Sequence, residues 1–105
     1  MGIVSKEEKK VGGVLIENLY HDSSSLLKTS YNHNTGQLTA TFVKGNVYIY
    51  NGIPIEIYEE LKTAESSGSY FSKNIAKSYN YHNLGNIDNE LITEMKEVVN
   101  SAKNL

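Results

Sequence analysis

The chain has 105 residues, of which 39% are hydrophobic, with 12 acidic residues, 10 basic residues and no cysteine. This length predicts a single domain with its own core, and the lack of cysteine excludes disulfides, thiolate nucleophiles and zinc ribbons. Every base is a lysine and the net charge is −2, so the chain lacks the arginines and the positive excess that favour binding to long duplex nucleic acid.

The first 22 residues predict an N-terminal extension. Residues 1–10 are rich in charge, and we expect them to be frayed. Residues 11–20, in which Gly12-Gly13 precedes the apolar run Val14-Leu15-Ile16, predict an edge strand. That run is far shorter than the roughly 20 residues of a membrane-spanning helix. We therefore expect no membrane partner and a cytoplasmic location.

Three strands are predicted over residues 25–31, 37–43 and 47–51. The turn Gly45-Asn46 favours a two-residue hairpin loop, which would place Thr41 opposite Tyr50. In that register the apolar side chains of the hairpin share one face of the sheet. Tyr48 and Tyr50 would then lie on the other face among threonines.

Helical spacing begins after Pro54 and again over residues 69–79, where Phe71, Ile75 and Tyr79 predict a core-facing stripe. Asp88 predicts the start of a C-terminal amphipathic helix, whose apolar stripe is Leu91, Ile92, Met95, Val98, Val99 and Ala102. The predicted class is α+β: a small antiparallel β-meander of three or four strands packed against helices, with the C-terminal helix in addition.

Charge is unevenly distributed along the chain. Residues 23–55 and 66–87 contain no acid, and their four bases are Lys28, Lys44, Lys73 and Lys77. One interpretation is a surface that accepts anions within a mildly acidic protein. The other is that strands and turns disfavour Asp and Glu regardless of function.

The acid-free segments also hold the residue types that bind nucleotides. Aromatic rings can stack on a base, and a serine- and glycine-rich loop before a helix can hold a phosphate on hydroxyl and N–H groups. Packing of half-buried tyrosines and simple helix capping explain the same residues without a ligand. The predicted ligand-binding residues are Tyr48, Tyr50, Lys28, Lys44, Ser67, Gly68, Ser69, Tyr70, Lys73 and Lys77.

Residues for catalysis or metal binding are few. No two of the three histidines, His21, His33 and His82, have the i, i+4 spacing of a helical metal pair. We expect no catalytic residues, no metal and no cofactor, and hence no enzyme activity.

A longer pattern runs from Ser24 to about Tyr81 and resembles the KTSC domain, a module named after a carboxy-terminal extension of some lysyl-tRNA synthetases. The resembling residues are Ser24-Ser25, Tyr31, Leu38, Phe42, Gly45, Tyr48-Ile49-Tyr50, Ile53-Pro54, Tyr58, Leu61, Ala64, Ser67-Gly68, Tyr70-Phe71, Ile75 and Tyr79. The resemblance implies a small α+β domain over residues 23–82, no established catalysis and a suggested role in RNA binding. Residues 1–22 and 83–105 then flank the module, the latter as the C-terminal helix.

Three functions remain open. The favoured one is non-enzymatic binding of a small phosphorylated nucleotide, used in a bacterial or phage protein to sequester a host immune signalling nucleotide. A compact anion needs only one or two lysines, whereas long RNA would bind weakly to so few. The alternatives are an RNA- or tRNA-binding module and an assembly module. Under the assembly hypothesis, residues 88–103 of the C-terminal helix join copies of the chain into a homo-oligomer.

Overall fold

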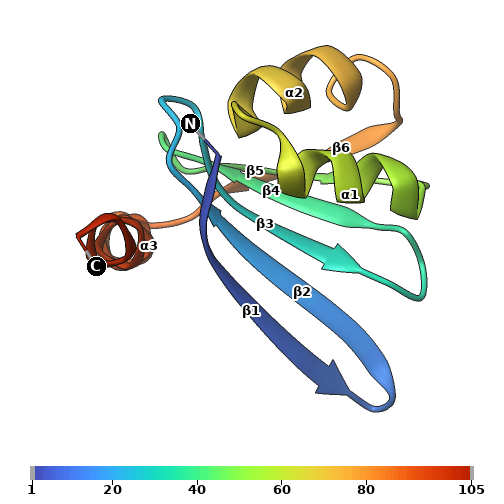
Figure 1. Ribbon diagram of the computed structural model, residues 1–105, viewed down its shortest axis with the longest axis horizontal. Helices are drawn as coiled ribbons and strands as arrows, with labels where there is room; N and C mark the ends of the chain where they lie inside the picture. The colour runs from blue at the N-terminus through green and yellow to red at the C-terminus, as the bar shows by residue number, and fades with distance from the viewer. Residues whose placement is uncertain (1, 105) are drawn as a thin grey trace.

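The computed structural model describes residues 2–104 as one antiparallel sheet with three helices. The strands cross the sheet in chain order: β1 (Ile3–Val11), β2 (Val14–His21), β3 (Leu26–Asn32), β4 (Leu38–Phe42), β5 (Asn46–Tyr50) and β6 (Tyr81–Asn86). Helices α1 (Ile55–Thr63) and α2 (Ser67–Asn74) cover one face, and α3 (Asn89–Lys103) lies apart from them (Figure 1). The α+β class is confirmed, with six strands where three or four were expected.

The two N-terminal strands form a hairpin that the sequence pattern did not predict. Residues 3–10, which the sequence predicts to be frayed, belong to β1. This strand pairs with β2 from Ser5 opposite Tyr20 to Val11 opposite Val14. β2 is therefore an interior strand, where an edge strand was expected. The many charged residues of β1 led to the prediction of a frayed segment. They are compatible with β1 because β1 is the edge strand of the sheet, where charged side chains discourage pairing with another chain.

The loop between β4 and β5 is longer than predicted. Thr41 pairs with Val47, which leaves Val43, Lys44 and Gly45 in the loop, and Gly45 takes a φ of 99° that favours glycine. Tyr50 therefore lies opposite Leu38, and the predicted pairing with Thr41 is wrong. Because the register differs by an odd number of residues, Tyr48 and Tyr50 lie on the same face as Leu38 and Ala40.

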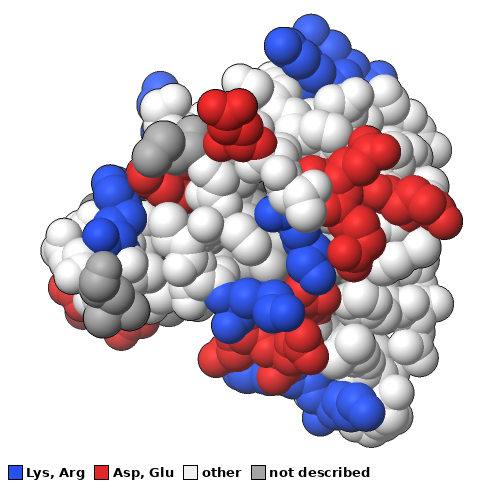
Figure 2. All heavy atoms as spheres, viewed as in Figure 1, with Lys and Arg blue, Asp and Glu red and all other residues white. Residues whose placement is uncertain are grey.

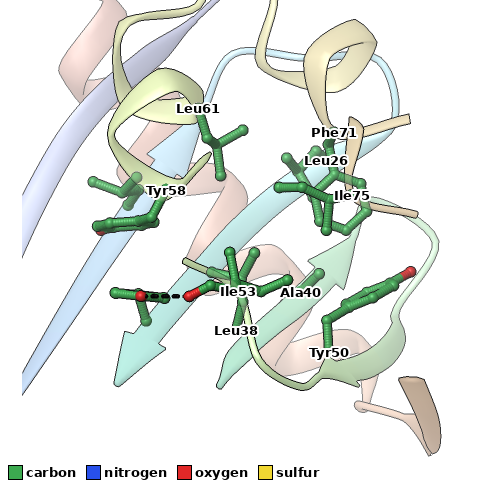
Figure 3. Close-up of a cluster of buried hydrophobic side chains, with 11 residues drawn as sticks. Leu26, Leu38, Ala40, Tyr50, Ile53, Tyr58, Leu61, Phe71 and Ile75 are labelled. Atoms are coloured by element: carbon green, nitrogen blue, oxygen red, sulfur yellow. Dashed lines mark hydrogen bonds between the residues drawn. The ribbon is translucent and has the colours of Figure 1, made fainter. Parts of the chain in front are cut away.

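The core fills the space between this face and helices α1 and α2 (Figure 3). Phe71 and Ile75 are buried in it, which confirms their predicted role. The hydroxyl of Tyr31 donates a hydrogen bond to the carbonyl of Ile53, 2.7 Å away, and this tethers the chain entering α1. The full cluster is Leu19, Leu26, Tyr31, Leu38, Ala40, Tyr50, Ile53, Tyr58, Leu61, Phe71 and Ile75.

The helix starts follow their predicted caps in two cases of three. Pro54 immediately precedes α1, and the Asp88 carboxylate accepts a hydrogen bond from the Leu91 N–H at the start of α3. Helix α2 begins earlier than residue 69 because Ser66 caps it, its hydroxyl accepting from the Ser69 N–H at 3.3 Å.

Helix α3 does not cover the tyrosine face, which lies beneath α1 and α2. It contacts β1, β2 and β3, and Ile92 packs directly on Gly45. Only Val99 of its apolar stripe is buried, whereas Leu91 is 42% and Val98 is 38% exposed. The helix thus lies against β1, β2 and β3, and Val99 is the one residue of its stripe that is buried there.

Candidate functional site

The β2–β3 loop and the start of α2 meet in a hollow of about 290 Å³. Its lining residues, which we call the serine cradle, are Ser23, Ser24, Ser25, Ser66, Gly68, Ser69 and Ser72. The first N–H groups of a helix have no partner within the helix, and together with hydroxyls they are the groups that hold a phosphate. The structure thus places two of the predicted residues, Gly68 and Ser69, in a polar hollow.

Gly68 allows the two halves of the serine cradle to approach each other. A Cβ atom at this position would lie 2.6 Å from the Ser23 hydroxyl and 3.0 Å from that of Ser25. Any larger residue would force the Ser23 hydroxyl to move. Packing between two protein segments therefore explains the glycine, whereas the sequence prediction assigned it to a ligand.

Three hydroxyls of the serine cradle have partners within the protein, and that of Ser25 lies 3.4 Å from the Ser23 hydroxyl. The Ser23 hydroxyl accepts hydrogen bonds from the N–H groups of Ser25 and Leu26, at 3.2 and 3.1 Å, and so shapes the loop. The Ser66 hydroxyl caps α2. The hydroxyls of Ser24, Ser69 and Ser72 have no such partner among residues 2–104.

A second hollow, of about 320 Å³, adjoins the serine cradle and shares Ser24 and Ser25 with it. We call it the aromatic hollow, and its other lining residues are Phe42, Val43, Lys44 and Asn46. Lys44 is exposed at its rim. One face of this surface therefore combines an ammonium group, an amide and an aromatic ring next to the serines.

The aromatic hollow leads into a row of rings on β4, β5 and β6. The ring centroids of Phe42 and Tyr48 are 5.7 Å apart, and those of Tyr48 and Tyr81 are 5.5 Å apart, both edge to face. Tyr81 is 54% exposed. The sequence pattern does not mark Tyr81 as a site residue, because β6 has no alternation of apolar and polar residues that would place it in the sheet.

Tyr50 cannot stack on a ligand, contrary to the prediction. It is only 3% exposed, packed edge to face with Phe71 beneath α2. The cause is the β4–β5 register, which turns its ring toward the core. Tyr48 lies on the same face, in the middle of β5, and is half-buried.

Lys28 is also separated from the serine cradle. It pairs with Thr41 and projects from the sheet face opposite the core, where its ammonium lies 5.3 Å from the centre of the Tyr20 ring. The prediction that Lys28 and Lys44 serve one site is therefore not supported by their positions.

The remaining predicted residues have other surroundings. Ser67 is fully buried. The Tyr70 hydroxyl donates a hydrogen bond to the Glu60 carboxylate, and this bond links α2 to α1. Burial, followed by this hydrogen bond, raises the pKa of Tyr70 to about 12. Lys73 and Lys77 are exposed and line neither hollow; Figure 2 shows basic side chains over α2 and acidic ones over α1.

None of the helices in residues 2–104 is long and apolar enough to span a membrane. In the same residues no group of three or more His, Cys, Asp or Glu side chains is placed to hold a metal ion.

Both hollows lie within a region that matches a known family. The family model described as the KTSC domain matches residues 22–79, more than half of the chain. This chain belongs to the KTSC domain family. The family resemblance stated from the sequence is thereby confirmed, and the matched KTSC region comprises β3, β4, β5, α1 and α2.

The relatives of the KTSC region are parts of much longer proteins. A lysine–tRNA ligase of Trichormus variabilis is 36% identical over 63 residues, which are 60% of this chain and 11% of the ligase. A lysine–tRNA ligase of a Nostoc species is 39% identical over 54 residues, 51% of this chain and 10% of the ligase. The chain thus matches about a tenth of the length of these curated relatives.

A solved structure shows the same fold. The crystal structure of a KTSC domain protein from Yersinia pestis is similar with a TM-score of 0.58 and 21% sequence identity. The similarity covers 77% of this chain and 100% of that one.

Besides the backbone pairing of β2 with β3, a buried carboxylate links the N-terminal hairpin to the KTSC region. Glu17 of β2 is 3% exposed, and its two oxygens lie 2.9 Å from His33 Nε2 and 2.9 Å from Lys62 Nζ. Burial alone would raise the pKa of Glu17, but hydrogen bonds from Lys62 and His33 hold it below the usual value. Beneath this group the rings of Tyr31 and Tyr58 stack 4.1 Å apart.

Proposed function

We propose that this chain is a non-enzymatic binding module for a small phosphorylated nucleotide. The phosphate would lie in the serine cradle at the start of α2, and the base would lie over the aromatic hollow toward Tyr48 and Tyr81. Lys44, at the rim between them, would pair with the phosphate.

The observation that carries the proposal is the joining of two hollows of complementary chemistry. All their lining residues come from the acid-free segments 23–55 and 66–87. Hydroxyls and helix N–H groups suit a phosphate, and the Phe42 to Tyr81 row offers the edges and faces that a base can contact. A compact ligand of this kind needs no arginine and little net positive charge.

The test begins with the protein as purified. Heating should release a nucleotide that mass spectrometry identifies, and calorimetry should measure binding of that nucleotide and of a panel of mononucleotides and cyclic oligonucleotides. The cyclic members test the hypothesis that the chain sequesters an immune signalling nucleotide. Absence of binding by every member of the panel would contradict the proposal.

Two substitutions locate the site. Lys44→Gln and Tyr81→Ala remove exposed groups at the two hollows and should each weaken nucleotide binding roughly tenfold. Lys28→Gln is the matched control, because it removes the same charge from the opposite face of the sheet. Equal losses for Lys28→Gln and Lys44→Gln would place the ligand elsewhere.

RNA binding is a second candidate, favoured by one observation. The matched relatives are lysine–tRNA ligases, enzymes whose name states that they act on tRNA, so the shared region would contact RNA in this chain too. This function predicts binding to a long single strand that weakens steeply as salt rises, because several phosphates displace counterions. If the affinity depends on salt concentration only as strongly as one or two phosphate contacts would require, the small nucleotide is favoured instead.

A further inference from the structure

A third hollow, of about 220 Å³, lies between the β2–β3 loop and α3. It shares Ser23 with the serine cradle and Val43 with the aromatic hollow, so the three hollows surround the same loop. We call it the α3 hollow, and its lining residues are His21, Asp22, Ser23, Leu27, Val43, Lys96, Val99, Asn100 and Lys103. Its α3 side lies outside the KTSC region.

Helix α3 supplies the polar groups of the α3 hollow from one stripe. Lys96, Asn100 and Lys103 are spaced i, i+4 and i+7, which places them on the same face of the helix. Asp22 is the one acid in the lining, and its carboxylate lies 3.3 Å from the Lys103 ammonium. Lys96 leaves the lining with a positive excess, so the α3 hollow favours an anion.

His21 adds a buried polar group to the same hollow. It is 1% exposed, its Nε2 lies 2.9 Å from the Thr29 hydroxyl, and its Nδ1 is buried without a hydrogen-bond partner. When Thr29 donates to Nε2, the proton of the neutral ring resides on Nδ1 as an unpaired donor. An unpaired buried donor costs free energy that an anionic oxygen would recover.

We infer that the α3 hollow is a second anion subsite, so that the ligand of this protein carries two phosphate groups, as a short oligonucleotide does. The inference rests on the proposed function, because the first phosphate is the one assigned to the serine cradle. The two phosphates would lie on either side of the β2–β3 loop. Helix α3 would thereby extend the site of the KTSC region from one nucleotide to two.

The test compares two probes, adenosine monophosphate and 5′-phosphorylated diadenylate, by calorimetry on the full chain. The double variant Lys96→Gln, Lys103→Gln should weaken binding of the diadenylate at least tenfold and leave the monophosphate unchanged. The matched control is Lys73→Gln, Lys77→Gln, which removes two exposed lysines that line none of the three hollows. It should change neither affinity.

Asp22→Asn separates a ligand role from a structural one. It breaks the ion pair with Lys103 but leaves both lysines free for a phosphate, so diadenylate binding should tighten severalfold. If the pair serves only to hold α3 in place, the same variant should weaken binding or leave it unchanged, which would overturn the inference.

The failures of the two proposals are distinguishable. If neither probe nor any nucleotide of the wider panel binds the wild-type chain, the proposed function is wrong. If both probes bind equally well, and the Lys96→Gln, Lys103→Gln variant binds diadenylate as the wild type does, only the second subsite is wrong.

Discussion

Burial of single polar residues sets how this protein responds to pH. His21 is the clearest case, because its ring lies inside the protein at the end of β2. Burial disfavours the charged imidazolium and lowers the pKa of His21 from 6.5 to about 4. In the unfolded chain the ring regains its ordinary pKa, so the unfolded state binds a proton at a higher pH than the folded state.

Acidification should therefore destabilise the protein, because unfolding allows His21 to take up a proton. The stability contributed by neutral His21 is complete above pH 6.5 and is lost as pH falls toward about 4. The expected slope is about 1.4 kcal/mol per pH unit, or about 2 kcal/mol between pH 6.5 and about pH 5. Urea unfolding at several pH values measures it. His21→Gln should abolish the slope, whereas His82→Gln, at an exposed position of β6, should retain it.

At the scale of elements, one charged contact adds to the backbone pairing of β2 with β3 in holding the N-terminal hairpin. Glu17 joins β2 to His33 at the end of β3 and to Lys62 of α1. The Lys62 side chain is 19% exposed and that of Glu17 is 3% exposed, so water screens this pair little. Removing one partner would leave the other charge buried and unpaired.

Lys62→Ala should lower the free energy of unfolding by about 3 kcal/mol, because the Glu17 carboxylate loses its cation. Lys9→Ala is the matched control: Lys9 pairs with Glu7 at 3.9 Å, but both side chains are more than half exposed. Such a pair is worth less than about 1 kcal/mol. Denaturant midpoints measure both changes, and equal losses would show that the Glu17 contact does not fasten the hairpin.

For the whole molecule, α3 leaves apolar surface uncovered. Leu91 and Val98 lie seven residues apart on its apolar stripe and are 42% and 38% exposed. Isolated exposed residues of this kind are common, but a stripe along one helix is the pattern through which helices pair. A homo-oligomer formed through residues 88–103 stays a prediction. We expect Leu91 and Val98 to lie at the centre of its interface.

Sedimentation of the wild-type chain should show a dimer at high protein concentration. The double variant Leu91→Lys, Val98→Lys should sediment as a monomer with unchanged thermal stability, because neither side chain belongs to the core cluster. A dimer that persists in this variant, or a wild-type chain that stays monomeric at all concentrations, would contradict assembly through α3.

The sequence alone determined the local features of the fold. Alternation marked β4, Pro54 and Asp88 marked the starts of α1 and α3, and helical spacing marked Phe71 and Ile75 as core. It also carried the KTSC resemblance that the family match confirms. These signals are local because periodicity and capping depend on residues within one or two turns of each other.

Only the tertiary structure decided the remaining features, because they depend on contacts between distant segments. The length of one turn determined the face of Tyr48 and Tyr50, and pairing with neighbouring strands ordered the charged β1 and the polar β6. The candidate site arises where the β2–β3 loop meets α2 and α3, more than 40 residues away in sequence. No periodicity in the chain records that the hydroxyls of Ser23 and Ser25 lie so close to Gly68 that a Cβ atom there would overlap that of Ser23.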